Sequence, residues 1–157
     1  MFSWLIWATL TAIAYFAQIS DNAGAGSWIT ALTAAISFFI FFFAIFKGEK
    51  NITKGDWLTF IAALSAIPVW MITDNPLWSV IIITVIDALG FYPTVRKSWD
   101  KPEEENMFHY FMAGLKFVLA VMALDNFSII TALYPLSLVF MNFAFIALVF
   151  VRKRAKA

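Results

Sequence analysis

Apolar residues fill six long segments of this chain, and a short, more polar stretch separates each segment from the next. A helix needs about 20 mostly apolar residues to cross the hydrocarbon core of a bilayer. Six segments approach that length, at roughly 2–20, 27–47, 56–73, 76–95, 106–124 and 127–150. The pattern therefore predicts an all-helical integral membrane protein, with a bundle of six transmembrane helices that forms a single membrane domain, residues 1–157.

Basic residues indicate the orientation of these helices. Every second connection contains lysine or arginine, and the connections between them contain neither. Because positively charged loops stay on the cytoplasmic side, both termini are expected in the cytoplasm. We expect the inner (cytoplasmic) membrane of the cell as the location and its lipid bilayer as the first partner. The residues concerned are Lys47, Lys50, Lys54, Arg96, Lys97, Lys101, Arg152, Lys153, Arg154 and Lys156.

Composition excludes several functional classes. Only 13% of the residues are charged, against about a quarter in a soluble domain. The net charge of +1 gives no reason to expect nucleic-acid binding. Without cysteine there is no disulfide or thiolate metal site. The chain shows no metal-ligand cluster, catalytic triad or phosphate-binding glycine motif, so we expect neither an enzyme nor a cofactor.

Two ionisable residues, Asp87 and Lys116, lie deep inside apolar segments. Asp87 is ten residues before Lys97, and Lys116 is ten residues after Asn106. At 1.5 Å per residue, both would lie about 15 Å from the cytoplasmic interface, near the bilayer middle. Charges at that depth cost at least ~2.5–3.5 kcal/mol and usually face a partner or a water-filled cavity. Because the two segments are consecutive and antiparallel, we expect a direct or water-bridged ion pair.

Two interpretations of this pair stay open. It is either a structural clamp between two helices, or a clamp that also borders a path for substrate or protons. His109 lies seven residues before Lys116 and therefore on the same helix face. A proton relay from His109 is one hypothesis, and a hydrogen-bonded side chain at the membrane interface is the simpler one. A lone histidine predicts no metal or haem site.

Narrow polar stripes run along several other segments. Thr11, Tyr15 and Gln18 follow i, i+4, i+7 spacing. Such groups often serve only as hydrogen bonds between helices. Their convergence with deeply placed charges nevertheless favours a polar cavity. The residues predicted to line or gate it are Asp87, Lys116, His109, Tyr15, Gln18, Tyr92, Tyr134 and Asn142.

Prolines recur in the two halves of the chain, residues 1–74 and 75–150. The third segment contains Pro68 and the sixth contains Pro135. Three helices per half would make the halves inverted repeats, as in many transporters. The alternative is two unrelated prolines, which membrane helices tolerate. Pro68, Pro93 and Pro135 are also expected to interrupt or kink their helices and so shape a central site.

A short motif ends the fourth segment, where Pro93-Thr94 is followed by Lys97, and Ala17-Gln18 occupies the matching place in the first half. These residues resemble the PQ-loop group of small membrane transporters, which includes the SWEET sugar facilitators. The resemblance covers about ten residues in each half. It implies a metabolite facilitator with a central site. The chain departs from that group because six spans without a linker helix give antiparallel halves, whereas the group uses parallel repeats or dimers of single units.

Transport of a small polar metabolite by alternating access is the function that these observations favour. The small-molecule substrate would bind near the midplane, beside Asp87 and Lys116. The alternative is a non-transporting membrane scaffold or assembly subunit, which would have a dry, filled interior. A lipid-handling enzyme would require the acidic run 103–105 to meet His109. A homodimer is plausible because a small bundle buries little surface alone.

Overall fold

The structure is a computed structural model that describes residues 2–47 and 54–156 of the chain, and this part is helical with no strand. The all-helical prediction is thereby confirmed, and each of the six predicted segments corresponds to one helix. The elements are α1 (Phe2–Ser20), η1 (Gly24–Gly26), α2 (Ser27–Lys47), α3 (Lys54–Thr73), α4 (Pro76–Asp100), η2 (Pro102–Glu104), α5 (Met107–Met122) and α6 (Ile129–Lys156).

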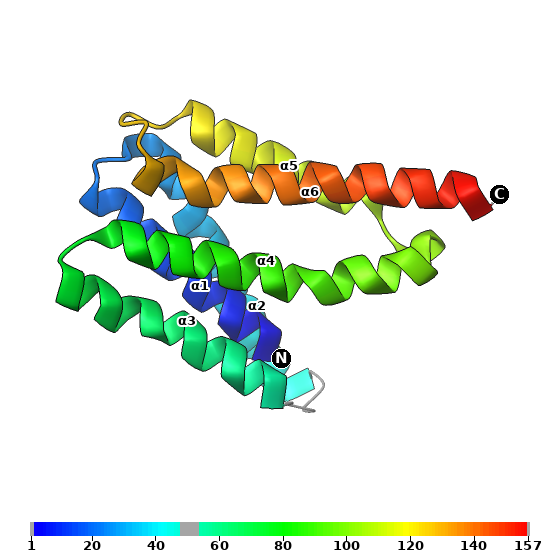
Figure 1. Cartoon of the computed structure of the whole chain (residues 1–157), viewed down its shortest axis with the longest axis horizontal. Coiled ribbons are helices and arrows are strands. Elements are labelled where there is room, and N and C mark those ends of the chain that lie inside the picture. Colours follow the sequence, from blue (N-terminus) through cyan, green and yellow to red (C-terminus); the bar gives the residue numbers. More distant parts are fainter. Residues whose placement is uncertain (1, 48–53, 157) are drawn as a thin grey trace.

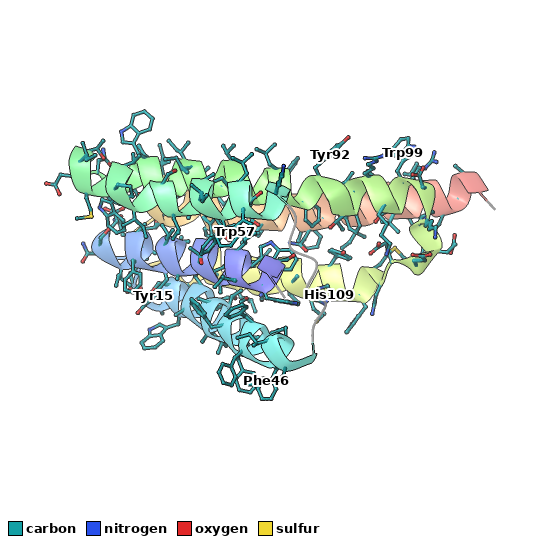
Figure 2. All side chains as sticks on the ribbon, turned by 90° about the horizontal axis from the view of Figure 1, so that it is seen from below. Tyr15, Phe46, Trp57, Tyr92, Trp99 and His109 are labelled. Atoms are coloured by element: carbon teal, nitrogen blue, oxygen red, sulfur yellow. The ribbon has the colours of Figure 1, made fainter. Side chains whose placement is uncertain are left out.

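Three segments are long and apolar enough to cross a membrane, namely Gly24–Phe46, Pro76–Asp100 and Ile129–Ala155. Two shorter apolar helices accompany them, Trp57–Thr73 and Met107–Met122. Large apolar side chains cover the outside of the bundle, and Phe46, for example, is 70% exposed and projects away from it (Figure 2). Water-soluble monomers rarely expose apolar surface on this scale. These features indicate a membrane protein.

The helices run alternately up and down, and the bundle has two distinct ends (Figure 1). At one end, here called the basic end, α4 and α6 end, with Lys97 in the last turn of α4, Lys101 just after it and Arg152 near the end of α6; α1 begins on the same side but nearer the middle of the long axis (Figure 1). At the other, here called the opposite end, the connections α1–α2, α3–α4 and α5–α6 lie together (Figure 1). The segregation of basic residues to one end agrees with the sequence prediction, although Lys50 lies outside the described residues.

Helix α1 lies at the centre of the packing. It contacts α2, α3, α4 and α6, and a second group is formed by α5 packed against α6. Small side chains allow this close approach, since Ala8, Ala14 and Ala17 on α1 have no exposed surface. The hydrophobic core that results joins Leu10 of α1 with Ile83 of α4.

Polar side chains and one glycine define the turns. Asn75 caps α4 by accepting a hydrogen bond from the backbone N–H of Leu77 at 2.9 Å, and Pro76 occupies the first helical position. Gly24 has a φ of +63°, and an added Cβ would lie 1.8 Å from Oδ2 of Asp125. Only glycine fits this place because the α1–α2 connection lies directly against the α5–α6 connection.

The predicted proline breaks are not found, because α3, α4 and α6 each continue through their proline. A proline removes one backbone N–H but leaves the rest of the helical ladder available. In α6 the carbonyl of Thr131, which Pro135 cannot pair, instead accepts a hydrogen bond from Nε2 of Gln18 at 2.9 Å. Pro68 is exposed on the surface of α3. Interruption of these helices is therefore not found, and the expected kinks stay a prediction.

The inverted repeat stays a prediction. Among the described residues, the backbones of α1 and α2 pack closely along their length, whereas those of α4 and α5, their counterparts in the second half, lie apart. The two halves thus differ in how their first two helices pack, and the packing by itself does not favour the repeat.

Candidate functional site

A cavity of about 350 Å³ lies inside the bundle, between five of the six helices. Its lining residues extend from the middle of the helices towards the basic end, and α3 contributes none of them. Polar and aromatic side chains are prominent in this lining. They are Trp4, Trp7, Thr11, Thr33, Ser37, Asp87, Phe91, Thr94, His109, Tyr110, Lys116, Phe117, Tyr134 and Asn142.

Asp87 provides a buried carboxylate in the wall of this cavity. It lies in the middle of α4 with only 6% of its surface exposed. The hydroxyl of Tyr134, on α6, donates a hydrogen bond to Oδ2 of Asp87 at 3.2 Å. Trp7, on α1, lies beside the same carboxylate in the cavity wall. Three helices therefore converge on one acidic group, which is the arrangement that lowers the cost of burying it.

Lys116 brings an ammonium group to the same cavity from α5. Its Nζ donates a hydrogen bond to the hydroxyl of Thr33, on α2, at 3.2 Å. The same Nζ lies 4.7 Å from the centroid of the Phe117 ring, close enough for a cation–π interaction. Lys116 is partly buried, so most of its stem lies within the bundle.

The expected direct ion pair between Asp87 and Lys116 is not formed in the described part of the chain, where no nitrogen–oxygen pair of the two lies within 4.0 Å. Two features of the packing explain the difference. The backbones of α4 and α5 lie apart, because the cavity and α6 lie between them, although the rings of Phe91 and Tyr110 meet with centroids 6.2 Å apart. Asp87 also lies eleven residues into α4, whereas Lys116 is six residues from the end of α5, so their depths differ. The two charges face one cavity but have different partners.

Two further predicted residues, His109 and Asn142, also line the cavity. His109 is exposed at its rim, and its ring centroid lies 5.4 Å from that of Tyr110 (Figure 2). Asn142 is buried, and its Nδ2 donates to the carbonyl of Leu138 in its own helix at 2.8 Å. The Asn142 side chain, which also carries the amide oxygen, lines the cavity. The relay through His109 stays a prediction.

Three predicted residues do not line the cavity. Tyr92 is 64% exposed and projects outward from α4, on the side away from the bundle (Figure 2). Tyr15 packs beside Phe16, with ring centroids 5.4 Å apart. Gln18 is fully buried at the opposite end, where it binds the Thr131 carbonyl. Of the predicted stripe Thr11, Tyr15 and Gln18, only Thr11 lines the cavity.

Sequence reasoning missed several lining residues, chiefly Trp7, Phe91 and Tyr110. A signal for Trp7 existed, because Trp4, Trp7 and Thr11 follow i, i+3, i+7 spacing on one face of α1. No comparable pattern marks Phe91, which is one of many aromatic residues in this chain.

The opposite end of the bundle is closed. A layer of small and polar side chains without exposed surface lies beyond the cavity, formed by Ala17, Gln18, Thr30, Ala120 and Thr131. The connections above this layer are joined, since Nδ2 of Asn126 donates to the carbonyl of Asp21 at 2.8 Å and the Ser128 hydroxyl donates to the Asp21 carboxylate. The cavity is therefore walled off on this side by closely packed side chains.

The basic end is held by charged and polar contacts. Glu104, in η2, binds Lys97 and Lys101, each at 3.2 Å. The hydrogen bond from Lys101, followed by that from Lys97, lowers the pKa of Glu104 below its ordinary value of 4.5. Arg152 of α6 donates to the carbonyl of Trp99 at 3.1 and 3.2 Å, and so ties α6 to the end of α4.

Comparisons with family models, curated proteins and solved structures gave no match for this chain. The described residues contain no group of three or more histidine, cysteine, aspartate or glutamate side chains that could hold a metal ion. The chemistry of the site is therefore that of one carboxylate, one ammonium group, hydroxyl groups and aromatic rings that face a small cavity.

Proposed function

We propose that this protein is a transporter or facilitator of a small polar metabolite. In this proposal it spans the inner (cytoplasmic) membrane six times, with both termini in the cytoplasm. The proposal is supported by one observation above others. A buried carboxylate, Asp87, faces a cavity that five helices line. Ionisable groups at membrane depth are costly to maintain and commonly mark substrate or ion pathways.

The shape of the cavity supports alternating access. Its lining reaches from Tyr134 and Thr33 towards His109 at the basic end, while the opposite end is closed by fully buried side chains. On the proposed topology the basic end faces the cytoplasm, so this conformation is inward-facing. Transport would then require the contacts between Asp21 and the α5–α6 connection to separate. Inverted repeats, if present, would supply the second conformation by exchanging the packing of the two halves.

The resemblance of the Pro93-Thr94 motif to PQ-loop transporters also supports transport of a small metabolite. Within it, Asp87, Lys116, Tyr134 and Asn142 contact the solute, and His109 lies at the cytoplasmic rim. Tyr15, Gln18 and Tyr92 are given no contact with the solute.

A ligand screen followed by transport assays tests this proposal. Purified protein is screened by thermal shift against pooled metabolites at several pH values, and hits are assayed for uptake into proteoliposomes. Asp87→Asn should abolish both signals. Asp74→Asn is the matched control, because it makes the same chemical change at an exposed position whose φ of 48° asparagine accepts.

The outcomes separate the two classes of function. Uptake that depends on Asp87 but not on Asp74 supports transport. Folded protein that binds and transports none of the metabolites would contradict it and favour the scaffold alternative. Wild-type uptake by Asp87→Asn would show that the cavity is not the pathway.

A further inference from the structure

The hydrogen-bonding positions of Lys116 and Asp87 that the described residues do not use indicate which solutes fit the cavity. The Lys116 ammonium has three N–H donors, and the hydrogen bond to Thr33 uses one of them. A carboxylate offers about four acceptor positions, and among the described residues the Tyr134 hydroxyl occupies one of those of Asp87. Both groups therefore retain hydrogen-bonding capacity that a ligand in the cavity could satisfy.

The arrangement of the charges selects for a ligand that carries both signs. Asp87 and Lys116 face the same cavity without an ion pair between them, so an ammonium group and a carboxylate can each find a partner of opposite charge. A solute with only one charge would leave the other site group without a counter-charge. It would also carry net charge into the membrane, which is costly at this depth.

The walls of the cavity define the rest of the ligand. Trp7, Phe91, Tyr110 and Phe117 offer aromatic surface to it. Its volume of about 350 Å³ lies near the lower end of the ~300–1,000 Å³ range of ligand pockets, so the ligand must be small. An apolar body attached to an ammonium group and a carboxylate would match both the aromatic walls and the two polar groups of opposite charge.

We infer that the cavity binds a small zwitterion with an apolar body, whose ammonium group contacts Asp87 and whose carboxylate contacts Lys116. Amino acids with apolar side chains belong to this chemical class. The inference names the substrate class of the proposed transporter and rests on that proposal for its physiological meaning. Binding itself can be measured independently of transport.

Two matched ligand sets test this inference on the purified protein in lipid nanodiscs. One set is L-phenylalanine, phenethylamine and 3-phenylpropanoate, and the other is L-leucine, 3-methylbutylamine and 4-methylpentanoate. Within each set, the amine lacks the carboxylate and the acid lacks the ammonium group. Calorimetric binding should favour at least one of the two zwitterions at least ~10-fold over both singly charged analogues, a ratio that corresponds to about 1.4 kcal/mol.

Variants assign each charge to its partner. In Lys116→Met, the preference of the zwitterion over its amine should fall below about threefold, because the carboxylate has lost its partner. In Asp87→Asn, the preference over the acid should fall in the same way. Asp74→Asn should keep both preferences. If Asp87→Asn does not fold, the order of the six ligands on the wild-type protein still decides the inference.

Binding of singly charged analogues as tight as that of the zwitterions, or no binding of either zwitterion, would overturn the inference. The proposed function fails in a different way. Uptake of some other solute into proteoliposomes, without zwitterion binding, would retain transport and reject this substrate class. Zwitterion binding without uptake of any solute would retain the site and reject transport.

Discussion

The hydrogen bond between Gln18 and α6 gives a prediction about how this bundle tolerates proline. Pro135 has no N–H, so the carbonyl of Thr131, four residues earlier, has no partner within its own helix. Nε2 of Gln18 donates to that carbonyl at 2.9 Å from the neighbouring α1, and both residues are fully buried. Gln18→Leu removes the donor at nearly constant volume and leaves the carbonyl unsatisfied.

The size of the effect follows from three contributions. A buried acceptor without a partner costs about 1–3 kcal/mol. Hydrogen bonds between helices in membranes contribute about 0.6–2 kcal/mol, since the unfolded chain also finds partners in the bilayer. Oε1 of Gln18 has no hydrogen-bond partner among the described residues, so leucine also relieves a buried unsatisfied oxygen. We therefore expect Gln18→Leu to lower the unfolding free energy by about 1–2 kcal/mol.

A double-mutant cycle distinguishes this mechanism from simple loss of packing. Pro135→Ala restores an N–H that can bind the Thr131 carbonyl within α6. In that background, the cost of Gln18→Leu should fall to about 0.5 kcal/mol or less, a coupling of about 1 kcal/mol. Pro68→Ala is the matched control, because Pro68 is exposed on α3 and should leave the full cost of Gln18→Leu unchanged.

Unfolding free energies for this cycle can be measured by denaturant titration of the purified protein in mixed micelles, followed by tryptophan fluorescence. An equal cost of Gln18→Leu in the wild-type and Pro135→Ala backgrounds would refute the reasoning. It would show that the freed carbonyl is not what Gln18 stabilises.

Three other expectations concern the site, the packing and the basic end. Tyr134→Phe removes the hydroxyl that donates to Asp87 at 3.2 Å. It should lower the unfolding free energy by about 1 kcal/mol in the same titration and weaken ligand binding, and unchanged binding and stability would count against this contact. Gly26→Ala should cost about 1–3 kcal/mol, because its Cβ would lie 2.5 Å from a backbone oxygen of α5. Gly90→Ala, with no atom within 4 Å of the added Cβ, should be neutral or stabilising by up to about 1 kcal/mol, and equal losses would disprove the packing argument. Because the pKa of Glu104 is lowered, its ionised form should add stability above pH 4.5, and this stability should be lost as the pH falls through the lowered pKa. The melting temperature of Glu104→Gln should therefore depend less on acid pH than that of the wild type. Identical pH profiles of the two proteins would contradict this expectation.

The local pattern of the chain determined the helices. Segment length, turn residues and the alternation of basic connections depend only on neighbouring positions, and they predicted six helices that the structure contains. The same pattern showed that Asp87 and Lys116 lie within apolar segments, since depth along a helix follows from counting residues at a fixed rise. It also indicated Tyr134 and Asn142, because helical periodicity places them on one face of α6.

Tertiary packing alone decided which side chains meet. Asp87 pairs with Tyr134 and Lys116 with Thr33, because α6 and the cavity lie between α4 and α5. The adjacency of their two segments in the sequence predicts an ion pair between Asp87 and Lys116 instead. The choice of neighbours depends on how the surfaces of several helices fit simultaneously, and no single segment contains that information. For the same reason, the place of Gln18 beside a proline-freed carbonyl became visible only in the folded chain.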